Sequence, residues 1–253
     1  MSAIYGGRVN LPSLHPEAIF IADAHHKPRA CALPKLLDQL LSAPPTQVFF
    51  MGDIFHVLVG SIKSSITPHK EVLAQIHALS RVSQVFYFEG NHDLLLGSLR
   101  ALEHVRVLAR AEQPAFFLYQ DRLLALAHGD LFVGWGYGLY ISLLRYSGVL
   151  YFLGGIDYAL PALYPLVQRR IDAKRIRNLE LTHTAWARFA KQRLACYGAC
   201  ARQKGLELGG VIEGHFHVGK GYQSKKGFYY ALPSFYGASL APTLAWMSEN
   251  WRN

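Results

Sequence analysis

Five short motifs rich in aspartate, histidine and asparagine occur along the sequence, each directly after a run of apolar residues. In chain order they are Asp23-Ala-His25, Gly52-Asp53, Gly90-Asn91-His92-Asp93, His128-Gly129-Asp130 and Gly214-His215-Phe216-His217. Carboxylate and amide oxygens together with imidazole nitrogens form a donor set that suits Mn²⁺, Fe or Zn²⁺. Structural zinc sites, in contrast, are rich in thiolates. One such motif alone is more often incidental, and a buried histidine bonded to backbone is the ordinary alternative. Five in order, each at the end of an apolar run, favour a shared metal site.

The apolar runs before the motifs have the composition of buried β-strands. They read AIFIADAH, QVFFMGD, QVFYFEGNHD, LLALAHGD and GGVIEGHFH, with Val, Ile, Phe, Tyr and Leu ahead of each polar group. Helix-like stretches at residues 34–41 and 68–80 separate the first three, which indicates βαβ units around a mixed sheet. Residues 115–127 and 221–232 have the pattern of hairpins. Parallel strands would gather the motifs along one sheet edge, where the ligand sites of open α/β sheets lie.

In this order the motifs resemble those of the calcineurin-like metallophosphoesterase family, over residues 19–235 with one interruption. The resemblance implies an α/β fold, a four-layer αββα sandwich of two mixed sheets flanked by helices. It also implies two divalent metal ions that share one carboxylate and one water. Two such cations lower the pKa of the shared water and neutralise charge on the phosphate oxygens that it attacks.

Carried onto matching positions, the resemblance implies seven metal ligands and one catalytic residue. The first metal would be held by Asp23, His25 and His217. The second would be held by Asn91, His128 and His215, with Asp53 as the bridge. His92, beside Asn91, is expected to stabilise or protonate the leaving oxygen.

Other polar residues of the motifs and their surroundings have two readings each. Asp93 and Asp130 either hold imidazoles in one tautomer or have structural roles in turns. His26, His56 and His183 could touch the substrate, although a structural role is the ordinary expectation for each.

Residues 131–205 differ from the strands that carry the motifs. The first half is rich in Tyr, Leu and Gly, and the second half is basic, with apolar residues at helical spacing. We interpret the segment as a helical insertion in a single domain that spans residues 1–253. It holds 11 Lys/Arg and 3 acids, a balance of +8, whereas the remaining chain has 15 bases and 14 acids, a balance of +1. An anionic partner is therefore expected at this segment.

Within the family, the UDP-2,3-diacylglucosamine diphosphatases of bacterial lipid A biosynthesis combine a compact domain, these motifs and a helical insertion after the HGD strand. This sequence is similar in all three respects. The resemblance implies hydrolysis of the pyrophosphate of UDP-2,3-diacylglucosamine to UMP and 2,3-diacylglucosamine 1-phosphate. The expected metal is Mn²⁺, with Fe or Zn²⁺ as alternatives. The chain departs from that subfamily in having His92 where Arg is common, and in the segment LFVGWGYGLY.

The insertion predicts where such a substrate would bind. Its apolar half would receive an acyl chain, and a basic cluster would face the substrate and an anionic membrane. That cluster consists of Arg169, Arg170, Lys174, Arg175 and Arg177. The three cysteines lack the spacing of a disulfide framework. We find no secretory signal and no uncharged stretch long enough to span a membrane. These features predict a cytoplasmic protein that is peripheral on the inner face of the cytoplasmic membrane.

Two other functions remain open at this stage. A nuclease or nucleotide phosphodiesterase could use the basic segment to follow a phosphate backbone and its Tyr and Trp side chains to stack on bases. A non-catalytic scaffold could keep the fold without the metals. The long apolar half favours lipid over nucleic acid, and the complete set of seven ligand positions argues against a scaffold.

Overall fold

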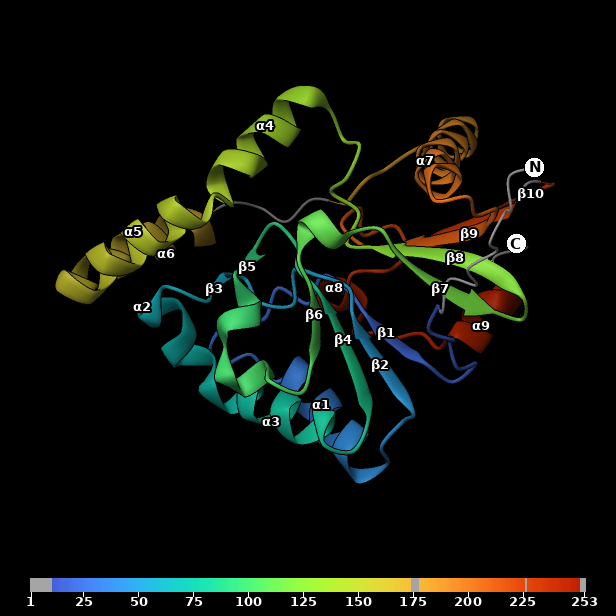
Figure 1. Ribbon diagram of the computed structural model, residues 1–253. Helices are drawn as coiled ribbons and strands as arrows, with labels where there is room; N and C mark the ends of the chain where they lie inside the picture. The colour runs from blue at the N-terminus through green and yellow to red at the C-terminus, as the bar shows by residue number, and fades with distance from the viewer. Residues whose placement is uncertain (1–10, 174–177, 226, 251–253) are drawn as a thin grey trace, which may run out of the picture.

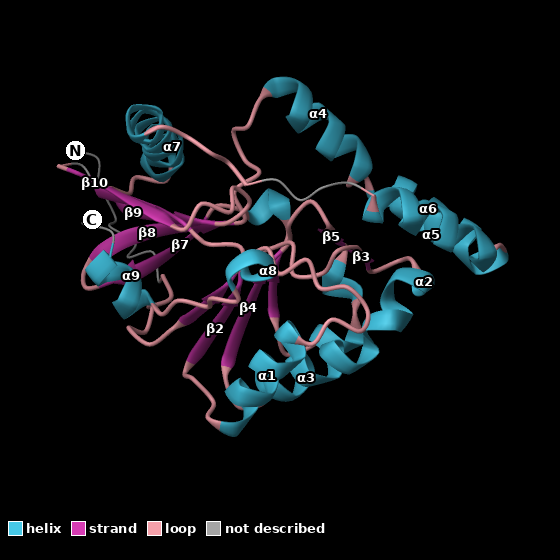
Figure 2. Ribbon diagram, turned by 180° about the vertical axis from the view of Figure 1, so that it is seen from behind, coloured by secondary structure: helices cyan, strands magenta, loops and turns pink. Residues whose placement is uncertain are grey.

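The computed structural model describes residues 11–173, 178–225 and 227–250. Two β-sheets pack face to face, and helices cover the outer face of each (Figure 1, Figure 2). The first sheet has the order β1 (Ile19–Ile21), β2 (Gln47–Phe50), β4 (Gln84–Phe88) and β6 (Arg106–Leu108). The second has the order β10 (Lys220–Ser224), β11 (Gly227–Ala231), β9 (Leu208–Glu213), β8 (Arg122–Ala127) and β7 (Ala115–Tyr119). The predicted four-layer αββα sandwich is confirmed.

The two sheets differ in strand direction. The second is mixed, because the antiparallel edge strands β7 and β10 flank the parallel strands β8, β9 and β11. The first differs from the expected mixed arrangement, since all four of its strands are parallel. Its strands are joined by crossovers rather than by hairpins, and such connections return each strand in the same direction. A short parallel pair, β3 (Leu58–Val59) and β5 (Asp93–Leu94), lies beside the sandwich.

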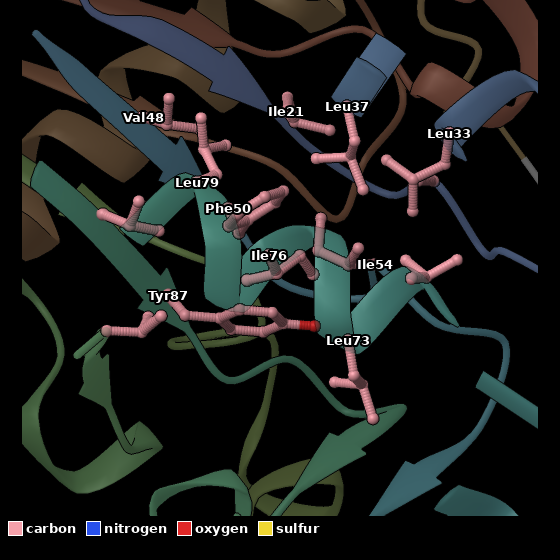
Figure 3. Close-up of a cluster of buried hydrophobic side chains, with 14 of the residues drawn as sticks. Ile21, Leu33, Leu37, Val48, Phe50, Ile54, Leu73, Ile76, Leu79 and Tyr87 are labelled. Atoms are coloured by element: carbon pink, nitrogen blue, oxygen red, sulfur yellow. The ribbon is translucent and has the colours of Figure 1, made fainter. Parts of the chain in front are cut away.

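The outer face of the first sheet is covered by α1 (Ala32–Ser42) and α3 (Lys70–Ser80), close to the two helices predicted there. The short helix α2 (Lys63–Ile66) and a 3₁₀ turn at Thr67–His69 lead into α3. Leucines three and four residues apart put one face of α1 against the sheet. Figure 3 shows Leu33 and Leu37 of α1 with Ile76 and Leu79 of α3, packed over Phe50 of the sheet.

Aromatic rings fill the space between the sheets. Phe20 stacks on Phe49 at 4.8 Å between centroids, and Phe49 stacks on Phe86 at 4.7 Å. Phe117 of the second sheet meets Phe49 edge-on at 5.4 Å. Because successive strand residues point to opposite faces, Phe49 faces the other sheet while Phe50 faces the helices. Both faces of the first sheet are therefore buried, as its continuous apolar strands predict.

The described part of residues 131–205 holds four α-helices, and they divide into two groups. The helix α7 (His183–Gln203) packs on β9 and β11 and forms the fourth layer of the sandwich. Its buried face includes Trp186, Ala190, Tyr197 and Ala201. The other three are α4 (Trp135–Leu144), α5 (Ser147–Ala159) and α6 (Tyr164–Asp172), and they project beyond the sandwich (Figure 1). Two helices, α8 (Phe235–Ala238) and α9 (Leu244–Asn250), close the described chain.

The helices α4–α6 expose much apolar surface. Of the 21 large hydrophobic residues that are exposed in the described chain, 17 lie between Phe132 and Val167. Trp135 and Tyr158 are 86% and 85% exposed. Among the described residues no single helix is both long and apolar enough to span a membrane, whereas α4 and α5 together, bent by 47°, have the length and composition to do so.

Candidate metal centre

The seven predicted ligands all follow the carboxyl ends of strands that point to one edge of the sandwich. Asp23 and His25 follow β1, Asp53 follows β2 and Asn91 follows β4. In the second sheet His128 follows β8, while His215 and His217 follow β9. Strands of both sheets thus deliver their motifs to one place, as expected for parallel strands.

Three of these residues form the first cluster. Ligand atoms of Asp23, His25 and His217 lie within 4.8 Å of one another. Oδ1 of Asp23 is 3.2 Å from Nε2 of His217, while its Oδ2 accepts the backbone N–H of His215 at 2.8 Å. Among the described residues, Nδ1 of His25 and Nδ1 of His217 are buried without a hydrogen-bond partner. Buried polar atoms are ordinarily paired, so this set has free ligand capacity that a cation would satisfy.

The second cluster joins Asp53, His128 and His215, again with ligand atoms within 4.8 Å. Nδ1 of His128 donates to the carbonyl oxygen of Met51 at 3.0 Å, so its Nε2 is the free nitrogen. That Nε2 lies 3.3 Å from Oδ1 of Asn91, 3.2 Å from Nδ1 of His215 and 3.7 Å from Oδ2 of Asp53. Four acceptor atoms converge, and a cation is what such a set accommodates.

The electrostatics of the clusters point the same way. Burial lowers the pKa of His25 to about 4, so its imidazole is neutral and able to coordinate at neutral pH. Burial opposes ionisation of Asp53, but His128 and His92 outweigh it and hold the pKa of Asp53 below its usual value. The pKa of His128 is raised to about 9, because the attraction of Asp53 and Asp23 exceeds the effect of burial. The carboxylates thus favour a positive charge at His128, and a bound metal ion would supply that charge in place of the proton.

Five of the seven predicted ligands have left-handed backbone conformations. They are Asp23 (φ 50°), His25 (φ 40°), Asp53 (φ 51°), His215 (φ 67°) and His217 (φ 57°). For non-glycine residues each such conformation costs on the order of 1 kcal/mol or more, and this strain gathers at functional sites. The surrounding backbone holds it in place: the N–H of Asp23 bonds to the carbonyl of Gly52 at 3.1 Å, and that of His25 to the carbonyl of Asp53 at 2.9 Å.

Glycines allow the motif loops to approach one another. A Cβ at Gly90 would lie 2.1 Å from Oδ1 of Asp53, and one at Gly52 would lie 2.3 Å from Nδ1 of His128. Any side chain at either position would therefore displace a predicted ligand.

The sequence profile described as calcineurin-like phosphoesterase matches residues 18–219. The chain belongs to this family. Membership makes it a metal-dependent hydrolase of phosphoric esters that uses divalent metals, for which the two clusters provide the donors.

Solved structures similar to this phosphoesterase come from several organisms. Wild-type Vps29 of Entamoeba histolytica complexed with Zn²⁺ is 15% identical, with 87% of this chain and 75% of that chain covered and a TM-score of 0.39. YfcE, a phosphoesterase from E. coli, is 14% identical, with 86% and 79% covered and a TM-score of 0.41. A dimetal phosphatase from Danio rerio is 14% identical, with 87% and 88% covered and a TM-score of 0.41. A search of curated protein sequences finds none that matches the chain.

In this phosphoesterase the predicted catalytic residue His92 lies half-buried at the rim of the two clusters. Its ring centroid is 5.1 Å from that of His25. Its Nδ1 bonds to the carbonyl oxygen of His56 at 2.7 Å. A carbonyl only accepts, so Nδ1 carries the proton and Nε2 is the nitrogen left for a reacting group.

The two motif aspartates have structural roles rather than orienting imidazoles. Asp93 accepts the backbone N–H of Ile54 at 2.8 Å and the hydroxyl of Tyr87 at 2.8 Å. Asp130 accepts Nε of Arg110 at 2.7 Å. The contacts therefore favour a structural role in the loop after Asp53 for Asp93, and an ion pair with Arg110 for Asp130.

The three additional histidines have different surroundings. His56 shares a possible ligand group with His25 and His92, so it borders the metal centre. His26 packs against His69, with 5.4 Å between ring centroids, and belongs to no metal cluster found among the described residues. His183 is exposed at the first turn of α7 and likewise belongs to none of these clusters.

A buried ion pair beneath the second-sheet loops was missed by sequence reasoning. Arg193 donates to Glu213 through Nε at 2.7 Å and Nη2 at 2.6 Å, and to the carbonyl of Gly129 at 3.0 Å. Tyr197 and Tyr229 donate their hydroxyls to the same carboxylate. The pair thus links the loop after β8 with the end of β9. Arg193 is one of the 11 bases counted in residues 131–205, and its residue is only 3% exposed.

A tyrosine of α4 also reaches the metal centre. The ring centroid of Tyr137 is 6.2 Å from that of His215. Burial, and then the nearby carboxylates of Asp130 and Asp53, raise the pKa of its hydroxyl well above the usual value for tyrosine. Among the described residues this buried hydroxyl has no hydrogen-bond partner. A neutral donor without a partner beside the clusters is placed to bind a phosphate oxygen. The glycines around Tyr137 do not mark this approach, because a Cβ at Gly134, Gly136 or Gly138 would meet nothing within 4 Å.

Proposed function

We propose that this phosphoesterase hydrolyses the pyrophosphate of UDP-2,3-diacylglucosamine and releases UMP and 2,3-diacylglucosamine 1-phosphate at the inner face of the cytoplasmic membrane. The observation that carries the proposal is the exposed apolar surface of α4–α6, which begins beside the metal centre. Contiguous apolar patches of more than a few hundred Å² are rare on monomeric soluble proteins and mark interaction sites.

The anchoring of α5 supports this use of the surface. Leu150 is buried with Val59 and Leu94 against the short β3–β5 pair. Gly154 lies so close to the body that a Cβ there would be 2.3 Å from the carbonyl oxygen of Ser61. One face of α5 is therefore packed, and side chains away from it, such as Phe152 at 69% exposure, are free to contact acyl chains.

The helix α6 adds positive charge and a contact at the site rim. Arg169 and Arg170 are exposed on it, whereas Lys174, Arg175 and Arg177 of the predicted cluster lie outside the described residues. Asp172, at the end of α6, pairs with Lys27 at 3.2 Å and with His56 at 3.1 Å. Basic residues near an anionic bilayer each contribute ~1 kcal/mol of attraction. This arrangement supports a surface that meets lipid headgroups next to the metal centre.

The chemistry follows from the donors already described. Two divalent ions, for which we propose Mn²⁺, would be held by Asp23, His25 and His217 and by Asn91, His128 and His215, with Asp53 between them. When bound, such ions polarise phosphate oxygens and make water nucleophilic near neutral pH. His92, with Nδ1–H bonded to the His56 carbonyl and a second proton on Nε2, would give the Nε2 proton to the leaving oxygen. The Tyr137 hydroxyl would donate a hydrogen bond to a phosphate oxygen. The apolar helices hold the acyl chains, so the phosphoryl group is presented in one orientation.

A soluble nucleotide or nucleic acid is the competing substrate. The same metal centre would accept a phosphodiester, and exposed aromatic side chains such as Trp135 and Tyr158 could stack on bases. The charges of Arg169 and Arg170 suit either partner.

Assays of purified protein with added Mn²⁺ separate these functions. We expect release of UMP from UDP-2,3-diacylglucosamine in detergent micelles, at a higher kcat/KM than the cleavage of bis(p-nitrophenyl) phosphate or of single-stranded DNA. Faster cleavage of DNA, with binding that weakens steeply as salt rises, would favour the nuclease. If the protein binds two metals and hydrolyses none of these substrates, the proposal is contradicted and the function as a non-catalytic scaffold is favoured.

A further inference from the structure

One arginine ties α4 to the loop that carries Asn91 and His92. Arg145 directly follows α4, and its Nη1 donates to the carbonyl oxygen of Gly90 at 2.6 Å. Its Nη2 donates to Oε2 of Glu89. The side chains of Arg145 and Glu89 are only 13% and 6% exposed. A cation from the projecting helices is thus inserted beneath the loop after β4.

Glu89 is held from several sides, so it transmits the position of Arg145 to the loop. Its Oε1 accepts the backbone N–H of Leu96 at 2.7 Å, and its carbonyl oxygen accepts Nε2 of Gln113 at 3.0 Å. Without the guanidinium, a buried carboxylate would lose its counter-charge and the Gly90 carbonyl would lose its donor.

The loop is in turn fixed against the proposed bridging carboxylate. Oδ1 of Asp53 accepts the backbone N–H of His92 at 2.8 Å. Gly90 packs so tightly on the same Oδ1 that even a methyl group would not fit. A shift of the Gly90 carbonyl therefore moves both Asp53 and His92, and misplacement of reacting groups by about 1 Å can cost ~10²-fold in rate.

We propose that Arg145 is a positioning residue for turnover: by holding Glu89 and Gly90 it fixes the geometry of Asp53 and His92, and it makes hydrolysis depend on the seating of α4. This inference rests on hydrolysis at the metal centre and not on the acylated substrate. It gives α4 two functional ends, since Tyr137 in its first turn reaches the clusters and Arg145 at its other end supports the loop.

The test uses a small soluble diester, so that lipid binding does not enter. Arg145→Met, Arg145→Lys and Glu89→Gln are compared with the unmodified protein on bis(p-nitrophenyl) phosphate, with metal content measured by mass spectrometry. Arg188→Met, at an exposed position on α7, removes the same charge away from the loop. We expect kcat of Arg145→Met to fall by about 10–100-fold with KM changed by less than about 2-fold and both metals retained.

A conservative variant and a double variant distinguish a positioning role of Arg145 from a general loss of structure. Arg145→Lys keeps a cation and should recover part of kcat, while Arg188→Met should match the unmodified protein. The double variant with Glu89→Gln and Arg145→Met should lose less than the two single losses combined, because both act through one contact.

Two results would overturn the inference. One is a kcat for Arg145→Met equal to that of the unmodified protein. The other is loss of metal or of folded protein in that variant with no recovery in Arg145→Lys. If the unmodified protein cleaves the diester but not the acylated substrate, only the proposed lipid function fails. If it binds two metals and cleaves neither, both fail together.

Discussion

The edge of the sandwich that carries the predicted ligands and the neighbouring helices α4–α6 differ in how firmly each residue is held. At the edge, Asp23, Asp53 and His128 are at most 3% exposed, and each is hydrogen-bonded to another motif loop. Along the helices, Trp135 is 86% exposed and α6 buries none of its residues. A metal centre needs fixed donors, whereas a surface for flexible acyl chains needs apolar area more than fixed geometry.

The same difference separates chemistry from substrate choice. Family membership establishes the reaction class. The ligand types and the strained backbone at the sandwich edge provide the site for that reaction. The helices contribute the proposed acyl and membrane contacts, and they touch the edge through few residues, among them Tyr137, Arg145 and Asp172. Changes at the edge, or at those three contact residues, should therefore affect all substrates alike, whereas changes at the exposed apolar side chains of α4–α6 should affect the acylated substrate alone.

The largest effect is expected at Asp53. Asp53→Ala removes the one carboxylate proposed to serve both metals, so turnover on every substrate should fall by more than the ~10–100-fold that loss of an outer partner costs. Metal content measured by mass spectrometry should fall with it. Near-native turnover with two metals bound would show that Asp53 is not the bridge.

The buried carboxylate of Glu213 should matter most for stability. Glu213→Gln leaves the Arg193 charge without its partner, which costs ~3–5 kcal/mol of unfolding free energy for buried pairs. Urea unfolding monitored by circular dichroism measures this. Glu249→Gln, at an exposed position of α9, is the matched control and should change the unfolding free energy little. Equal effects of the two substitutions would mean that the pair does not hold the loops.

His92 should separate catalysis from metal binding. His92→Ala should keep both metals but slow turnover by ~10²-fold or more, because general acid catalysis contributes 10²–10⁴-fold. The loss should be similar for the acylated substrate and for bis(p-nitrophenyl) phosphate. Loss of metal in this variant would instead make His92 a ligand.

The smallest effect is expected on α6. The double variant with Arg169→Glu and Arg170→Glu should weaken binding to anionic phospholipid vesicles by at least ~10-fold, since each base near such a surface contributes ~1 kcal/mol. Arg188→Glu with Lys191→Glu makes the same charge change on exposed positions of α7. Sedimentation with vesicles compares them. If both pairs weaken binding equally, net charge rather than α6 determines the attraction.

Local patterns in the sequence predicted much of the fold and the positions of the candidate ligands. Each motif combines an apolar run with the ligand it delivers, so the ends of β1, β2, β4, β8 and β9 could be located without knowing how the strands pair. The hairpin of β7 and β8 was predicted, and its turn residues Gln120 and Asp121 both have positive φ. The hairpin predicted at residues 221–232 corresponds to the antiparallel pair β10 and β11.

Long-range partners could not be predicted in this way. Arg193 could not be distinguished from the other bases of its segment, because Glu213 lies on β9, 20 residues further along the chain, and nothing local marks it as the partner. The role of α7 was also hidden, since an apolar stripe at helical spacing looks the same in an insertion and in a helix that covers a sheet. Arg145 is likewise one of the 11 bases counted in residues 131–205, and nothing local in the sequence indicates that it binds Glu89 and Gly90.

Comparison of kcat/KM for UDP-2,3-diacylglucosamine and for the same nucleotide sugar without acyl chains tests the central claim most directly. Both substrates present the same pyrophosphate to the metal centre, so any difference in kcat/KM must come from contacts to the acyl chains. Burial of each methylene contributes ~0.8 kcal/mol, so partial burial of one chain against α4–α6 predicts a preference of at least ~10²-fold for the acylated substrate. Equal kcat/KM values would contradict the claim that these helices select a lipid.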